Sequence, residues 1–171
     1  MQPAAMLAQI AADGAALRDA AVDRLAAEVP TCPGWTVRDV VEHTGAVYAH
    51  KSTIIEKNLT DSPEGWPPAW DFTDPIEWFD EQHRRVLAAL RSRDPAFPVG
   101  TWYEPEQTVG FWVRRMMQET VIHRADVESA VGPPSRVDGE VALDGIDELV
   151  ERMVCYWVED YQQAPGAGQV V

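Results

Sequence analysis

WVRRMMQETVIHRADVESA, residues 112–130, repeats core-type positions at alternating steps of three and four residues, the period of a buried helix face. The stripe consists of Trp112, Met116, Glu119, His123, Val127 and Ala130. Two of its six members are ionisable, and an unpaired carboxylate in a protein core costs several kcal/mol. Glu119 therefore needs a strong partner, a changed protonation state or a water-filled cavity. A divalent metal ion would be such a partner.

Glu119 and His123 lie one helical turn apart, so their side chains can bind one ion with bonds of ~2.0 to 2.2 Å. His43 interrupts the apolar stripe of another predicted helix, residues 37–59, and is expected to face inward as well. The three residues would form a metal site with one position open to water or substrate, as in catalytic zinc sites. The alternative is an ordinary Glu119–His123 helix pair and a buried histidine satisfied by a backbone carbonyl.

Three further ionisable residues lie on the predicted helices. His50 lies near the same helix face and could bind a cofactor or substrate, although we favour a position at the solvent edge. Asp126 follows His123 by three residues and can orient its imidazole; an ion pair with a neighbouring arginine is the alternative. His83 lies in the polar run DEQHRR and is expected at the surface.

The whole chain is expected to form an all-α bundle of four main helices plus a fifth. The predicted helices span roughly residues 3–27, 37–59, 75–92, 109–131 and 141–162. Thr36 and Thr108 are placed to cap helices with their hydroxyl groups, and Gly132 to end one. A single domain is expected over residues 1–165, followed by a flexible tail over 166–171.

Two connections between these helices are rich in proline and aromatic residues. They are DSPEGWPPAWDFTDP, residues 61–75, and RDPAFPVGTWYEPEQ, residues 93–107. Proline excludes regular helix there, and the first loop is placed to cover a pocket. A further interpretation is an interaction bundle whose loop rings dock a partner. The rings concerned are Trp66, Trp70, Trp102 and Tyr103.

Charge and composition exclude several classes of function. The balance of 14 Lys and Arg against 28 Asp and Glu gives a net charge of -14, which repels phosphate backbones and anionic membranes. No nucleic-acid or membrane partner is therefore expected. The chain lacks an apolar segment of about 20 residues and a secretory signal, which indicates a cytoplasmic protein. Cys32 and Cys155 belong to no CxxC pair and are expected to be reduced thiols.

Three separated segments resemble the mycothiol-dependent maleylpyruvate isomerase family of the DinB-like superfamily. They are VPTCPGWTVRDVVEHTGAVYAH (29–50), QETVIHRADVESAVG (118–132) and VDGEVALDGIDELVE (137–151), and they occur in the family's order. The similarity extends over about residues 25–151. This resemblance implies a DinB-like four-helix bundle that binds a divalent metal, typically zinc, through His43, Glu119 and His123.

The same resemblance implies an activity that uses the small thiol mycothiol. The thiol binds the metal as a thiolate and attacks a small electrophile, because metal coordination deprotonates a thiol near neutral pH. The expected function is thus a thiol transferase or isomerase; a homodimer is compatible with it. The family's isomerase carries an additional C-terminal domain that contributes to its active site, whereas this chain ends soon after the fifth predicted helix. The alternative is a non-catalytic metal- or ligand-binding regulatory bundle.

Overall fold

The computed structural model describes residues 1–61 and 73–156. Within these ranges the chain forms five α-helices and one π-helical turn, and it forms no β-strand. The all-α prediction is therefore confirmed. Most of the first predicted proline-rich loop and the last residues of the fifth predicted helix, 157–162, lie outside the described residues.

Contacts between Cα atoms divide the chain into two compact units. One is Gln2–Arg136, and the other consists of Met1 with Val137–Val171. The single domain expected over residues 1–165 stays a prediction. Its expected flexible tail, residues 166–171, lies outside the described residues.

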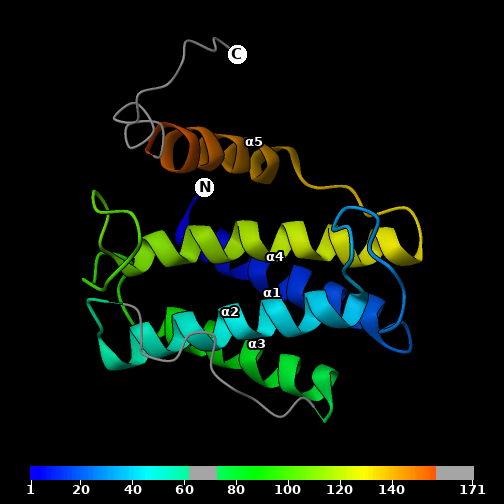
Figure 1. Cartoon of the computed structure of the whole chain (residues 1–171). Helices are drawn as coiled ribbons and strands as arrows, with labels where there is room; N and C mark the ends of the chain where they lie inside the picture. The colour runs from blue at the N-terminus through cyan, green and yellow to red at the C-terminus, as the bar shows by residue number, and fades with distance from the viewer. Residues whose placement is uncertain (62–72, 157–171) are drawn as a thin grey trace, which may run out of the picture. The chain divides into compact units, whose positions relative to one another are not determined.

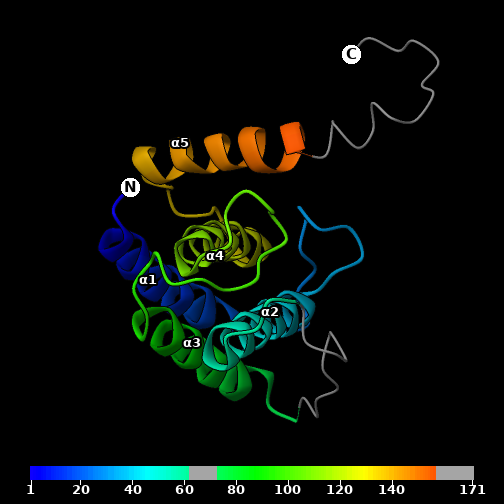
Figure 2. The same cartoon turned by 90° about the vertical axis from the view of Figure 1, so that its left-hand side faces the viewer.

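Four helices of the first unit form the predicted bundle. They are α1 (Pro3–Ala21), α2 (Val37–Lys57), α3 (Pro75–Arg91) and α4 (Val109–Val131). Along the bundle axis, α1 packs against α3 and α4, and α2 packs against the same two helices from the opposite corner (Figure 2). Helices α2 and α4 run in opposite directions (Figure 1). The N-terminal half of α2 therefore faces the C-terminal half of α4.

Apolar side chains from all four helices fill the bundle core. The largest fully buried ones include Ile10, Leu17, Tyr48, Ile55, Phe79, Leu90, Phe111, Trp112, Met116 and Met117. Burying one apolar side chain of this kind stabilises a fold by about 1.5 to 3 kcal/mol. This core holds α2 and α4 as fixed neighbours, which is the arrangement that the candidate site requires.

Short-range polar contacts set the helix ends. Thr36 and Asp39 form a reciprocal capping box at the start of α2, as the predicted Thr36 cap requires. The predicted extension of α1 to residue 27 is wrong, because Asp23 adopts a left-handed backbone with φ 59° and the chain turns. The carbonyl of Ala27 instead accepts from the backbone N–H of Val37 in the first turn of α2.

The end of α4 and the start of the second unit also follow local signals. Thr108 accepts a hydrogen bond from the backbone N–H of Phe111, and Gly132 ends α4 as predicted. In the second unit α5 (Gly139–Glu148) continues into the π-helical turn η1 (Leu149–Val154). None of the helices in the described part of the chain is both long and apolar enough to cross a membrane.

His83 is a core residue, so the prediction of a surface position is wrong. Its imidazole is only 8% exposed, and its Nε2–H donates to the carbonyl of Ile10 on α1 at 3.0 Å. The ring packs directly over Gly14, where a Cβ atom would collide with it. Its polar sequence neighbours suggested a surface position, but His83 follows the buried Phe79 by one helical turn and lies on the same buried face of α3. Burial lowers the pKa of His83 below its usual 6.5.

Candidate metal centre

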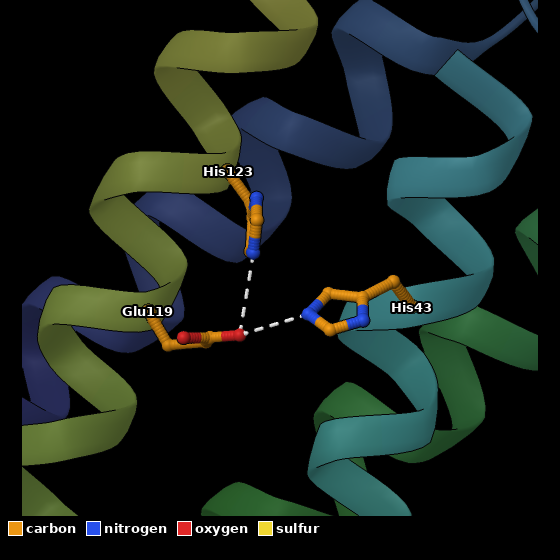
Figure 3. Close-up of side chains that lie close together, drawn as sticks. All are labelled: His43, Glu119 and His123. Carbon is orange, nitrogen blue, oxygen red and sulfur yellow. Dashed lines mark hydrogen bonds and ion pairs between the residues drawn. The ribbon is translucent and has the colours of Figure 1, made fainter. Parts of the chain in front are cut away.

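Helices α2 and α4 bring the three predicted ligands together (Figure 3). His43 Nε2 and His123 Nε2 each lie 3.3 Å from the same oxygen, Glu119 Oε1. The three candidate ligand atoms lie within 4.8 Å of one another. The two imidazole rings meet edge to face, with centroids 5.1 Å apart. This cluster can hold a metal ion.

The distances match the geometry of a small divalent ion. Two ligand atoms of a tetrahedral zinc ion, each bonded at about 2.0 to 2.1 Å, lie ~3.3 Å apart. Both nitrogen–oxygen separations in the cluster have this value. Two imidazoles and one carboxylate are also a donor set that zinc accepts in catalytic sites. The residues present therefore fit a zinc ion, the metal that the family resemblance implies.

Asp126 and Thr31 position His123 from the side opposite the cluster. The Nδ1–H of His123 donates to Asp126 Oδ2 at 2.9 Å, and the Thr31 hydroxyl donates to Asp126 Oδ1 at 2.7 Å. A histidine that donates through Nδ1 presents the lone pair of Nε2 to a metal. Arg124 was the alternative partner for Asp126, but it forms its ion pairs with Asp13 and Glu128.

Charges in the cluster favour a cation between the ligands. Burial opposes ionisation of Glu119, but hydrogen bonds with His123 and His43 hold its pKa well below the usual range. Burial also disfavours the charged form of His123, yet hydrogen bonds to Asp126 and Glu119 raise its pKa to about 9. The cluster thus attracts positive charge, which a proton or a divalent ion can supply.

Glu119 is held by both of its oxygens. Oε1 faces the two imidazoles, and Oε2 accepts from Arg115 Nη2 at 3.1 Å. Arg115 lies one helical turn before Glu119 on α4 and is buried. It therefore keeps the carboxylate oriented while Oε1 remains directed at the cluster.

Solvent can reach the cluster from the side of His43. The His43 side chain is 40% exposed, whereas those of Glu119 and His123 are 17% and 13% exposed. The apolar stripe predicted a more buried His43; its ring instead lies at the edge of the bundle, beside the loop that carries Trp35. The Trp35 and His43 rings meet edge to face with centroids 5.2 Å apart. A ligand arriving from solvent can thus approach the open side of the cluster.

His50 does not belong to this cluster. The favoured prediction of a solvent-edge position is wrong, because the residue is only 5% exposed. Its Nδ1 accepts from the Lys51 ammonium at 2.6 Å, and both residues line a separate cavity. Burial, and then the charge of Lys51, lowers the pKa of His50 to about 4. The hypothesis that His50 binds a cofactor or substrate stays a prediction.

The described aromatic rings of the second proline-rich loop pack onto α4. Trp102 and Tyr103 are half-buried, and both rings contact Phe111. This packing counts against the interpretation that these two rings form a docking surface. Trp66 and Trp70, the other members of that set, lie outside the described residues.

Sequence reasoning missed three residues beside the cluster: Thr31, Trp35 and Arg115. The spacing of Arg115, one turn before Glu119, is a signal that could have identified it. Thr31 contacts Asp126 across 95 positions of sequence, and no local pattern reports such a contact. Cys32 and Cys155 form no disulfide within the described residues, and their reduced state stays a prediction.

Comparison with known proteins gives one family. Residues 4–128 match the family model of the mycothiol maleylpyruvate isomerase N-terminal domain. This range includes the three candidate ligands, Asp126, the whole of α2 and α3, and all of α1 except its first residue. No curated protein and no solved structure matches the chain.

Proposed function

Since the chain belongs to the mycothiol maleylpyruvate isomerase N-terminal domain family, we propose that it is a metal-dependent thiol transferase or isomerase. His43, Glu119 and His123 hold the divalent ion, for which zinc is the expected identity. Mycothiol is the proposed thiol, and the second substrate is a small electrophile. The observation that carries the proposal is the approach of two imidazole nitrogens to one Glu119 oxygen at 3.3 Å each.

The charge of the donor set supports thiol chemistry. Two neutral imidazoles and one carboxylate contribute a single negative charge, so a divalent ion held by them keeps a net charge of about +1. Such an ion lowers the pKa of a bound thiol and favours the thiolate, which is the nucleophilic form. The partial exposure of His43 leaves room for the thiol to approach.

The protein's own residues orient the ligands and hold protons at defined atoms. Asp126 keeps a proton on His123 Nδ1, which leaves Nε2 available for the ion. Thr31 holds Asp126 in this orientation. Arg115 keeps Glu119 aligned and helps to maintain its negative charge. These contacts reduce the reorganisation that ligand binding would otherwise require.

Metal content and thiol consumption test the proposal together. Wild-type protein should bind one zinc ion and consume mycothiol in the presence of an electrophile such as a nitroaromatic chloride. Glu119→Gln should lose both properties. Glu81→Gln, at an exposed position of α3, is the matched control and should retain both.

Two results would contradict the proposed function. Thiol consumption that continues after complete metal removal would exclude the metal-activated thiol. Zinc binding without mycothiol binding or turnover of a panel of electrophiles would instead support the non-catalytic binding bundle.

A further inference from the structure

A cavity lies beside the C-terminal end of α2 and the N-terminal end of α4, ends that meet in the bundle (Figure 1). Its volume is about 190 Å³. Its lining residues include Lys51, Ile54, Asp61 and Trp112. A single water needs only ~10 to 15 Å³, whereas pockets for drug-sized ligands measure about 300 to 1,000 Å³. The cavity is therefore suited to a small molecule or to one end of a larger one.

This cavity is separate from the metal cluster. Lys51 follows His43 by eight residues on α2, which corresponds to about 12 Å along a helix axis. Trp112 precedes Glu119 by seven residues on α4, which corresponds to about 10 Å toward the N-terminal end of that helix. Because α2 and α4 are antiparallel, both displacements point toward the same end of the bundle. The antiparallel helices thus carry the metal cluster at one level and the cavity at another.

Lys51 gives the cavity wall a positive charge. Its Nζ atom lies 4.6 Å from the centre of the Trp112 ring and donates to His50 Nδ1 at 2.6 Å. These two contacts place the ammonium at the cavity wall, where the charges of Glu119 and Arg115 also act on it. Asp61 also lines the cavity, but it is exposed, so water screens its charge more strongly.

The walls also offer apolar surface beside this charge. Ile54 is 2% exposed and Trp112 is 2% exposed, and both line the cavity. A ligand with a negative group next to a short apolar or aromatic stem matches both features.

We infer that this cavity binds a small organic carboxylate, with Lys51 contacting the carboxylate and with Trp112 and Ile54 packing against the carbon stem. The inference goes beyond the proposed thiol chemistry and does not depend on the metal. Burial lowers the pKa of Lys51 to about 8, and a bound carboxylate would favour the charged amine.

The chain has two lysines, Lys51 and Lys57, which makes a direct test available. Full-length protein with ¹³C at lysine Cε gives one NMR signal for each residue. Benzoate is the probe, and benzamide, of the same shape without the charge, is the control ligand. We expect benzoate to shift the Lys51 signal and to raise the pKa of Lys51, while the signal of the exposed Lys57 stays unchanged.

Variants distinguish a charge contact from a structural effect. A hydrogen bond to a charged group corresponds to an affinity change of about 10- to 100-fold, so Lys51→Met should weaken benzoate binding by that factor. Lys51→Arg should retain binding, and Lys57→Met should leave it unchanged. Thermal unfolding of each variant establishes that it is folded.

Three results would overturn the inference. They are the absence of benzoate binding to wild-type protein, equal binding of benzoate and benzamide, and unchanged benzoate binding by folded Lys51→Met protein. None of these results bears on zinc binding by the cluster, so the two proposals fail independently.

Discussion

Replacing Asp126 with Asn should weaken zinc binding without removing any of the three proposed ligands. Asp126 accepts from His123 Nδ1 at 2.9 Å and from the Thr31 hydroxyl at 2.7 Å. Asparagine preserves the shape but removes the negative charge that keeps the proton on Nδ1. Loss of such an orienting partner lowers metal affinity by about 10- to 100-fold. This factor corresponds to about 1.4 to 2.8 kcal/mol of binding free energy.

A competition titration with a chromogenic chelator at pH 7.5 measures this change directly. Asp19→Asn, at an exposed position of α1, controls for the loss of one negative charge and should leave the zinc Kd unchanged. Thr31→Val should have a smaller effect than Asp126→Asn, because it removes only a support of the carboxylate. A zinc Kd for Asp126→Asn within about twofold of wild type would refute the reasoning that Asp126 orients a metal ligand.

Three further predictions concern stability. Burial lowers the pKa of His83 below 6.5, so the stability that its neutral form contributes is present above about pH 6.5 and is lost as the pH falls toward the folded-state pKa. Between pH 7.5 and pH 5 the urea midpoint of His83→Gln should therefore fall less than that of wild type. Equal falls in the two proteins would contradict this. A Cβ at Gly100 would collide with the backbone of Thr60, so Gly100→Ala should lower the free energy of unfolding by about 1 to 3 kcal/mol, whereas Gly139→Ala, which meets no atom within 4 Å, should not. Thr36→Ala should lower the unfolding free energy by about 0.5 to 2 kcal/mol through loss of the cap, with Thr36→Ser close to wild type; equal urea stability of both variants would count against the capping role.

Local periodicity was sufficient to predict the elements that carry the site. Glu119 and His123 share one helix, so their one-turn spacing fixes their separation whatever the rest of the fold does. His43 comes from a different helix, and its arrival beside them depends on the antiparallel packing of α2 and α4. The stripe on α2 indicated an inward face, and the family resemblance indicated which partner that face would meet.

The errors arise where tertiary contacts override local character. Polar neighbours suggested a surface position for His83, but Gly14 leaves space for its ring and a carbonyl satisfies its N–H group. The end of α1 was predicted too late because alanines favour helix, whereas the carbonyl of Ala27 is needed at the start of α2. Neither the space over a glycine nor a cap from a distant segment has a signature in a short window of sequence.

X-ray absorption at the zinc edge of the reconstituted full-length protein tests the central claim most directly. We predict one zinc ion per chain, with two imidazole nitrogens and one carboxylate oxygen at ~2.0 to 2.2 Å. The double variant His43→Ala, His123→Ala should lose this spectrum and its bound zinc. A sulfur neighbour at ~2.3 Å from Cys32 or Cys155 in thiol-free buffer, or stoichiometric zinc that persists in the double variant, would contradict the account.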